Sequence, residues 1–580
     1  MHRKNTDRLL HSTLVASALA LAPAAAWGDD IPAAGQPGFE ERELERIDPQ
    51  RFRPQPALDL DIPEVEPMED VPHAEFDVER YSFRGNTVFH DSELAELMAD
   101  YRGTITFEEL LEGADRITSA YRERGYIVAR AYVPEQTIED GTVEIAVLEG
   151  ALGELQFTGD EPITTERMAQ RFDRLAADGR INQGDLERGA LLLNDLPGMS
   201  AGINLRPGEE VGTTDVVVEA RDEGTFDFSV DYNNFGAEVT GEHRFGAQLG
   251  INNLFGVGDR FSFRPIVSDT GDTFYGSLGF DMPMFTPATR VGIRGSYLQS
   301  ELGEEFEDLE IENTATTGEL YATHTFVRTR DFTWSMRFGY ENRQFERTFD
   351  ADFSDREIEV ADYSLDVIDL GTTIDTRDRL WGGGMTSYYV NLRHGLSEVD
   401  EEGGDVVPGE ARIDGEFTSL LAGAQRLQAL PGNWSVMAEV DGQYSGDNLD
   451  TSERMSLGGP NAVRAYRPSE ALGDSGLIGR SELRYNLSEA VADVGWIGRL
   501  EVFGLLDGGV TQLNADPDVA GQEDEISFTR SAWGAGVRLS RADQYYIDFT
   551  VANRLGDQES NVDQPDDDET QFWAQAVYWF

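Results

Sequence analysis

The sequence predicts a β-barrel membrane protein, with an antiparallel transmembrane barrel of about sixteen strands preceded by two small α/β domains. Three observations predict this fold class. The chain from residue 223 to its end alternates apolar and polar residues in short segments, which is typical of strands with two unlike faces. Glycine is abundant, at 60 of 580 residues. Before residue 223, one order of strands and helices occurs twice.

The composition excludes several classes of protein. The chain has 109 acidic and 47 basic residues and a formal net charge of −62, so no nucleic acid is expected as a partner, because phosphate contacts need clustered Lys and Arg. Cysteine is absent, which excludes disulfide frameworks, iron–sulfur clusters and cysteine-ligated zinc. Beyond the N-terminus no apolar run reaches about 18 residues, which excludes a helical membrane protein. A barrel stays compatible because its strands alternate faces.

Residues 1–28 are expected to be a secretory signal peptide. Arg3, Lys4 and Arg8 precede an apolar stretch that ends in small residues around position 26. A short buried helix is the alternative. A signal peptide directs the mature chain out of the cytoplasm, into an envelope compartment that lacks ATP.

Residues 29–73 form a proline-rich, acidic segment that cannot bury enough apolar surface to order itself. Within it, residues 39–47 could form a short helix with Leu44 and Ile47 on one face. The segment is therefore either a flexible tether or a tether that carries a docking helix, and this helix is a candidate plug for a pore.

The first α/β domain is expected at residues 74–150. Thr106-x-x-Glu109 is a capping box that opens a helix with an apolar stripe, and Asp91 is expected to cap the helix before it. Strands on either side give the order β-α-α-β-β, with the one after the helices expected at 126–134.

The second domain, at residues 151–222, repeats that order, with helices expected at 164–175 and 185–193. Two tandem domains with open sheet edges suggest a binding unit, because an exposed edge can accept an extended peptide as an added strand. The alternative is that the edges are covered and the domains are spacers.

Residues 223–580 are expected to form the barrel. Four segments show the alternation clearly: 226–232, 332–340, 434–444 and 545–551. A soluble β-sandwich could alternate in the same way. Here, however, Arg, Asp and Glu lie in the middle of strands and aromatic residues cluster at strand ends, as in a barrel with lipid outside and water inside. At roughly 22 residues for a strand and its connection, these 358 residues give about sixteen strands.

The last ten residues form an amphipathic strand that ends on an aromatic residue. Tyr578 and Phe580 share its apolar face. This ending looks like the signal by which outer-membrane barrels are recognised for insertion.

Several motifs resemble one family, the outer-membrane transporters (TpsB) of two-partner secretion systems, within the Omp85 superfamily. They are LLLNDLPG at 191–198, LRPG at 205–208, DYNNFG at 231–236, INNLFGVGD at 251–259, GGPNAVRAY at 458–466, GLIGRSELRY at 476–485 and LLDGG at 505–509. The resemblance covers nearly the whole chain after the signal peptide. It implies that the two α/β domains are POTRA domains, POTRA 1 at 74–150 and POTRA 2 at 151–222.

The resemblance also implies a site inside the barrel. Val463, Arg464, Ala465 and Tyr466 match the family's V-R-G-F/Y loop, with Ala465 in place of the usual glycine. The loop arginine is implied to pair with Asp507 on the barrel wall. A guanidinium can hold a carboxylate in a bidentate, geometrically fixed pair. Gly508 and Gly509 would let the loop approach the wall, and Leu505 stands where the family favours Phe or Gly.

The function that follows is export of a large, unfolded, β-rich partner protein to the cell surface without ATP. The partner would be a TpsA-type exoprotein, such as an adhesin, a haemolysin or a contact-dependent toxin. Outer-membrane lipid and, during biogenesis, the barrel assembly machinery are the other expected partners. The expected location is the outer membrane, with the POTRA domains in the periplasm.

Two other functions stay open: an Omp85-type insertase or lipid-handling barrel, and a passive diffusion porin. Two POTRA domains and the proline-rich segment argue against the first, and the presence of periplasmic domains argues against the second. No G-x-S-x-G, H-E-x-x-H or catalytic cysteine occurs, so no enzyme, cofactor or metal site is expected. Acidic runs at 400–402 and 566–569 could bind calcium, but they are expected to be solvated loops, as such charge runs usually are.

Overall fold

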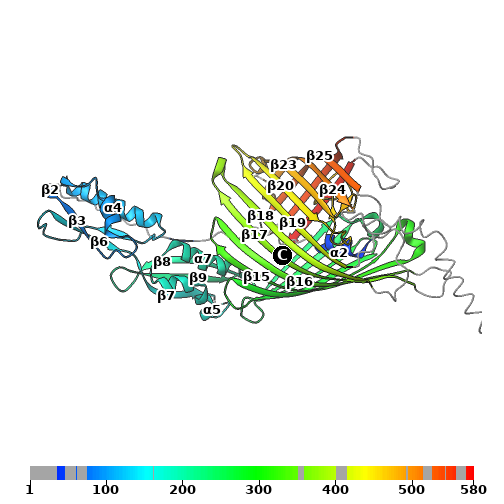
Figure 1. Ribbon diagram of the computed structural model, residues 1–580, viewed down its shortest axis with the longest axis horizontal. Helices are drawn as coiled ribbons and strands as arrows, with labels where there is room; N and C mark the ends of the chain where they lie inside the picture. Colours follow the sequence, from blue (N-terminus) through cyan, green and yellow to red (C-terminus); the bar gives the residue numbers. More distant parts are fainter. Residues whose placement is uncertain are drawn as a thin grey trace, which may run out of the picture.

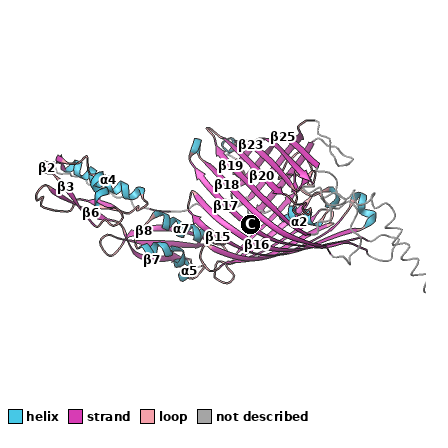
Figure 2. Ribbon diagram, viewed as in Figure 1, coloured by secondary structure: helices cyan, strands magenta, loops and turns pink. Residues whose placement is uncertain are grey.

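The computed structural model describes residues 36–45, 60–61, 75–160, 162–349, 358–399, 415–491, 494–513, 526–542, 544–556 and 570–580. The expected signal peptide and both acidic runs lie outside these residues, as does most of the proline-rich segment. Figure 1 shows a barrel with two small α/β domains projecting from one end, and Figure 2 shows that strands dominate. Within the described residues, no helix has both the length and the apolar character needed to cross a bilayer.

Sixteen antiparallel strands close into a barrel, as the sequence predicts. The first and last strands meet through five residue pairs, from Ser229–Trp579 to Asn233–Gln575. The strands, in order around the barrel, are β10 (Phe226–Asn233), β11 (Arg244–Asn252), β12 (Arg260–Ser268), β13 (Thr273–Pro283), β14 (Thr289–Glu301), β15 (Ile311–Arg328), β16 (Phe332–Phe349), β17 (Ile358–Asp378), β18 (Gly384–Val399), β19 (Gly415–Ala429), β20 (Trp434–Ser445), β23 (Ser475–Asn486), β24 (Arg499–Leu513), β25 (Ile526–Arg541), β26 (Tyr545–Arg554) and β27 (Thr570–Trp579).

Alternation along the strands separates the two faces of the barrel. On β10, Phe228 and Val230 are exposed on the outside, whereas Ser229 and Asp231 are buried inside. The sequence predicts a polar inside facing water, but the inside of the barrel is not polar throughout. Eight inward side chains of the strands form an apolar cluster with Leu44 of an N-terminal helix and Leu449 of a connection: Ile266, Tyr275, Leu298, Ala315, Phe345, Leu365, Val367 and Phe417. They are buried because a helix packs on them, and alternation alone cannot reveal this.

That helix is α2 (Pro37–Glu45), which lies within the outline of the barrel in Figure 1. The sequence predicts a helix over 39–47, and the structure places one two residues earlier, with Leu44 fully buried. Ile47 lies outside the described residues. The described parts of the connections contain short 3₁₀ helices and a two-stranded ribbon: η5 (Glu238–Thr240), η6 (Glu304–Leu309), η7 (Leu380–Gly382), η8 (Ser488–Val491), β21 (Met455–Ser456) and β22 (Leu472–Gly473).

The first α/β domain contains β2 (Glu75–Val78), β3 (Arg80–Arg84), α3 (Asp91–Leu97), β4 (Gly103–Thr106), α4 (Phe107–Glu123), β5 (Arg130–Tyr132) and β6 (Thr142–Leu148). Strands β3, β6 and β5 form a sheet, and β2 pairs with β4.

The Thr106 capping box is confirmed, because the Thr106 side chain accepts from the Glu109 amide. Asp91 is not the cap of α3. His90 takes that position, and Asp91 is the first helical residue. The strand expected over 126–134 shrinks to three residues because Ile127 and Ala129 form tight turns through their backbone amides.

The second domain contains β7 (Ala151–Gly159), α5 (Thr165–Ala169), η4 (Gln170–Phe172), α6 (Asp173–Asp178), α7 (Gln183–Asn194), β8 (Met199–Pro207) and β9 (Thr213–Asp222). The single helix expected over 164–175 is broken at η4. The break turns Phe172 into the core, where it packs directly on the backbone of Gly189. The sheet order is β1–β8–β9–β7, and β1 (Leu60–Asp61) comes from the proline-rich segment.

Candidate functional site

Residues 446–474, between β20 and β23, fold back into the barrel and are called the lumen loop here. Arg464, at its inner turn, donates from Nε and Nη2 to the two oxygens of Asp507, each over 2.8 Å. Asp507 lies on β24 and faces the opposite side of the wall from its neighbour Leu506, since Leu506 is 60% exposed on the outside whereas Asp507 is buried. The structure therefore places the two residues together inside the barrel.

A second carboxylate binds the same guanidinium. Glu482 on β23 accepts from Arg464 Nη1 over 2.5 Å and is also bound by Arg484, over 2.7 Å. Burial alone would lower the pKa of Arg464, but Asp507 and Glu482 raise it above its usual value. The loop arginine thus stays charged, and N–H groups on all three of its guanidinium nitrogens donate to two fixed carboxylates.

Three further contacts hold the backbone and ring of the loop motif. Trp573 on the last strand donates from Nε1 to the carbonyl of Arg464 over 2.7 Å. The Tyr466 ring is fully buried, with the guanidinium of Arg554 4.7 Å and that of Arg530 5.2 Å from its centroid. Glu482, Trp573 and both flanking arginines contribute to the site, although no sequence pattern predicted this. Only Glu482 lies in a quoted motif.

The remaining motif residues make apolar packing contacts instead of hydrogen bonds through their side chains. Val463 and Ala465 are fully buried in the apolar cluster between the loop and the wall. Ala465 is not among the residues with positive φ, so its turn needs no glycine. A Cβ at Gly509 would lie 2.6 Å from Leu457 Cδ1 in the loop, whereas one at Gly508 would meet only ordinary contacts. The close approach of loop and wall is therefore at Gly509.

Helix α2 is held inside the barrel by its own polar contacts with the wall. Glu40 accepts from Thr273 over 2.9 Å and lies 3.3 Å from Arg244, and burial raises the pKa of Glu40 despite that arginine. Glu41 accepts from Ser296 over 2.8 Å and from Thr317 over 3.0 Å. These partners lie on β11, β13, β14 and β15, on a different part of the wall from Asp507.

The helix and the lumen loop also touch each other. Arg42 Nη1 donates to the carbonyl of Ser452 over 3.0 Å and to that of Arg454 over 2.5 Å. A Cβ at Gly38 would lie 2.7 Å from the Cβ of Ser452. Two elements from distant parts of the sequence therefore fill the lumen side by side, each anchored separately.

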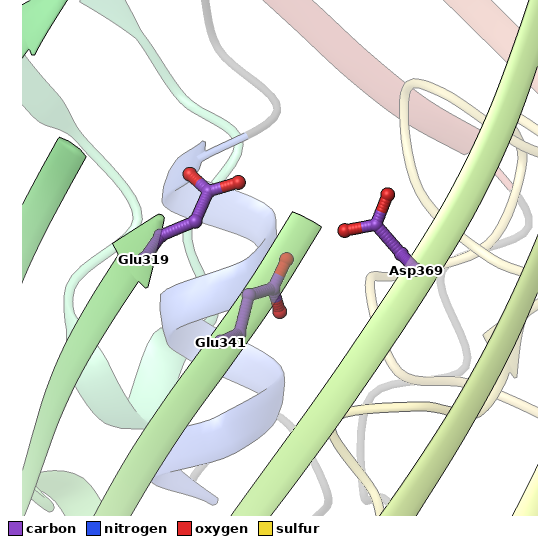
Figure 3. A group of neighbouring side chains, drawn as sticks. All are labelled: Glu319, Glu341 and Asp369. Carbon is purple, nitrogen blue, oxygen red and sulfur yellow. The ribbon is translucent and has the colours of Figure 1, made fainter. Parts of the chain in front are cut away.

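Three neighbouring carboxylates on β15, β16 and β17 could in principle hold a metal ion (Figure 3). They are Glu319, Glu341 and Asp369, with ligand atoms within 4.8 Å of one another. Arginines already neutralise them. Arg337 pairs with Glu319 and, over 3.1 Å, with Asp369, and Arg343 and Arg393 approach Glu341 at 2.6 and 3.1 Å. The donor set suits an ion-pair network better than a cation site.

A cavity of about 910 Å³, with several charged side chains in its wall, lies beside the tip of the lumen loop. Its wall includes Asn461 and Arg464 of the loop, Arg484 of β23 and Trp579 of β27. Near the same end of the last strand, Tyr578 and Phe580 point outward, with 47% and 76% of their surfaces exposed. Their rings contact each other, with centroids 4.8 Å apart.

Comparison with known proteins identifies this architecture. The family model described as "Haemolysin secretion/activation protein ShlB/FhaC/HecB" matches residues 212–539, which is more than half of the chain. The chain belongs to this family. A model of the ShlB-type POTRA domain matches residues 76–150.

Individual relatives agree with the family assignment. The heme/hemopexin transporter protein HuxB of Haemophilus influenzae is 26% identical over 505 residues, covering 86% of each chain. The outer membrane transporter CdiB of Dickeya dadantii is 26% identical over 420 residues, covering 71% of this chain and 72% of that one. The solved structure of CdiB from Escherichia coli superposes with a TM-score of 0.67 at 21% identity, covering 93% of this chain and 95% of the other, which supports the fold.

Family membership establishes the general role. The protein is a TpsB-type outer-membrane transporter that serves the secretion of partner proteins, and its POTRA domains lie in the periplasm. Its activity is transport rather than catalysis.

Proposed function

We propose that the protein exports one large, unfolded, β-rich exoprotein to the cell surface without a nucleotide. The observation that carries this proposal is the filling of the lumen by two separately anchored elements, α2 and the lumen loop. A passive pore needs no such elements. A channel that must seal between export events does.

The proposed cycle assigns a role to each part. POTRA 1 (74–150) and POTRA 2 (151–222) capture the N-terminal secretion domain of the partner by strand addition and polar contacts. Helix α2 leaves the lumen, while Arg464 and Asp507 keep the loop in place against the wall. The partner then folds outside, which prevents its return and supplies the driving force.

We also propose how the barrel is inserted into the outer membrane. Residues 223–580 form the part of the chain that is inserted into outer-membrane lipid. Tyr578 and Phe580 present outward aromatic rings at the end of the last strand, which suits recognition by the barrel assembly machinery.

The test uses proteoliposomes that contain the purified full-length protein. The probe is the denatured product of the adjacent gene, enclosed on the POTRA side and scored by protease accessibility outside. We expect export without any added nucleotide, and none in liposomes that contain a porin instead. Export that requires ATP, or equal export of an unrelated unfolded protein, would contradict the proposal.

A further inference from the structure

The edge of the POTRA 2 sheet is occupied by a piece of the same chain. Strand β1 runs parallel to β8, with Leu60 opposite Ile203 and Asp61 opposite Asn204. This two-residue strand comes from the segment that joins α2 to POTRA 1. The structure thus shows that the β8 edge accepts an extended peptide, and in which direction.

The edge of β8 on which β1 lies is also better suited to strand addition than the edges of β7, β5 and β3 in the described residues of the two POTRA domains. It belongs to a strand of nine residues with a regular register against β9. The opposite edge strand, β7, carries a register shift between Leu152 and Leu155, and bulges disfavour further pairing. In POTRA 1 the edge strand β5 has three residues and β3 has five.

Hydrogen-bonding groups delimit the available part of the β8 edge. The backbone amide of Ala201 donates to the side chain of Asn194 over 2.5 Å, which closes the start of the edge. Backbone groups alternate sides along a strand, so the amides of Ile203 and Leu205 point the same way as that of Ala201. The edge available for pairing therefore begins at the position where β1 pairs.

The side chains of β8 define the peptide that fits. Ile203 and Leu205 are buried in the POTRA 2 core, whereas Asn204 is partly exposed and Arg206 fully so. A strand added beside them needs an apolar residue opposite Ile203 and a polar, preferably acidic, residue on the Arg206 face. Residues 57–62, ALDLDI, alternate in this way.

We infer that the β8 edge of POTRA 2 is the docking site for an alternating apolar/acidic strand of the exported partner, and that β1 occupies this site until the partner displaces it. The inference rests on the proposed function and deepens it, because it names the edge, the strand direction and the competitor.

Displacement of β1 also has a consequence inside the barrel. Fourteen residues, 46–59, join the end of α2 to β1. While β1 is paired, α2 is held at the lumen wall and β1 at POTRA 2. Release of β1 frees one end, so partner docking outside the barrel removes a restraint on the helix that fills it.

The test is a disulfide that holds β1 in place. The chain has no cysteine, so Leu60→Cys with Ile203→Cys creates a single possible bond. The probe is a fluorescent synthetic peptide with the sequence of residues 57–62, added to the full-length protein in detergent. We expect at least tenfold weaker peptide binding when the bond is oxidised, recovery with a reductant, and no such change in either single-cysteine variant.

Two further readouts separate this inference from the proposed function. In planar lipid, the peptide should raise the ion conductance of the reduced protein and leave that of the oxidised protein unchanged. Export of the partner in cells should fall when the bond forms. The inference would be overturned if peptide binding, or the conductance change caused by the peptide, were the same in the oxidised and the reduced protein. If the unmodified protein did not export the partner at all, the proposed function would be overturned, whereas the result on peptide binding would still hold.

Discussion

Arg464 is the residue on which the position of the lumen loop depends most. Arg464 is 5% exposed, and its guanidinium faces two carboxylates that are also buried. Breaking a buried ion pair by removing one partner typically costs about 3–5 kcal/mol, because the other charge is left without compensation. The same arrangement in a solvent-exposed pair contributes much less.

We predict that Arg464→Ala leaves the barrel assembled and lowers export at least tenfold, because Asp507 and Glu482 lose their shared cation. Arg464→Lys should recover only part of the activity, since a lysine cannot form the bidentate pair. Export is measured in cells, and barrel assembly by heat-modifiable gel mobility. Arg467→Ala is the control, because Arg467 lies in the same loop but pairs with the exposed Glu238. Normal export by the Arg464→Ala variant would contradict the anchoring role.

Glu149 is a buried charged residue at the junction of the POTRA domains, and like Arg464 it binds several partners at once. It accepts from the backbone amides of Thr87 and Val88 over 2.5 and 2.8 Å and from the Tyr121 hydroxyl over 2.8 Å. Arg180 of POTRA 2 lies 3.5 Å away. Burial alone would raise the pKa of Glu149, but the hydrogen bonds outweigh it and lower that pKa below 4.5.

This lowered pKa predicts the pH dependence of POTRA 1 stability. A carboxyl group with a lowered folded pKa stabilises fully above its unfolded value of 4.5, and the contribution is lost as the pH falls through the folded pKa. Glu149→Gln should cost about 1–3 kcal/mol at pH 7, and this cost should shrink at low pH. The measurement is pulsed hydrogen exchange of residues 75–150 in the full-length protein after equilibration in urea.

Glu144→Gln is the matched control for Glu149, since Glu144 lies in the same domain and pairs with the exposed Arg84. It should change stability little at any pH. An equal effect of the two substitutions would show that the buried hydrogen bonds of Glu149 stabilise POTRA 1 no more than the exposed ion pair of Glu144 does.

At the scale of elements, the lumen loop and α2 differ in how far the sequence predicts their contacts with the barrel wall. The pairing of Arg464 with Asp507 could be expected from the family motif. The partners of α2 could not, because the segment around the helix reads as a proline-rich tether and its contacts on β11 to β15 are about 200 residues away or more. The sequence predicted a short helix but carried no information on which wall would receive it.

The strands illustrate the same limit. Period-two alternation predicted the barrel because lipid imposes one rule on every outward residue. No single rule governs the inward residues, so Phe345 and Tyr275 are buried against α2 while Glu341 and Arg343 form ion pairs nearby. Contacts such as Trp573 with the Arg464 carbonyl depend on loop geometry, which periodicity does not encode.

We predict that Gly38→Val unseats α2 and raises ion conductance in planar lipid several-fold. The new side chain would collide with Ser452 and with the ring of Phe345, whose nearest atoms lie 2.7 and 3.2 Å from the Cβ position. Gly446→Val is the control, because nothing lies within 4 Å of a Cβ there. Single-channel recordings that show the same closed state for Gly38→Val and the unmodified protein would contradict a plugging role for the helix.

At the scale of the whole molecule, the POTRA domains and the barrel are joined by specific polar contacts. Arg328, at the end of β15, donates to both oxygens of Asp195 in POTRA 2, over 2.9 and 2.7 Å. Asn253 donates to the carbonyl of Pro162. These contacts hold POTRA 2 against the end of the barrel from which the two domains project (Figure 1).

The net charge of −62 is a property of the whole chain and predicts how the molecule responds to salt. Many like charges on one surface repel one another and oppose the compact state. Salt reduces this repulsion, because the Debye length falls from about 10 Å at 0.1 M to about 3 Å at 1 M. Buried pairs such as Arg343 with Glu341 are screened much less, so their contribution survives. A host that lives in high salt would make such a surface tolerable.

We therefore predict that the melting temperature of the full-length protein in a non-ionic detergent rises by several degrees between 0.1 and about 2 M KCl. Because screening depends on ionic strength, NaCl should give the same gain. At pH 4 the gain should be smaller, since many carboxylates are then protonated and the repulsion is already reduced. A melting temperature that stays constant or falls with salt would show that surface repulsion is not what limits stability, and would remove the reason to assign the acidity to a high-salt environment.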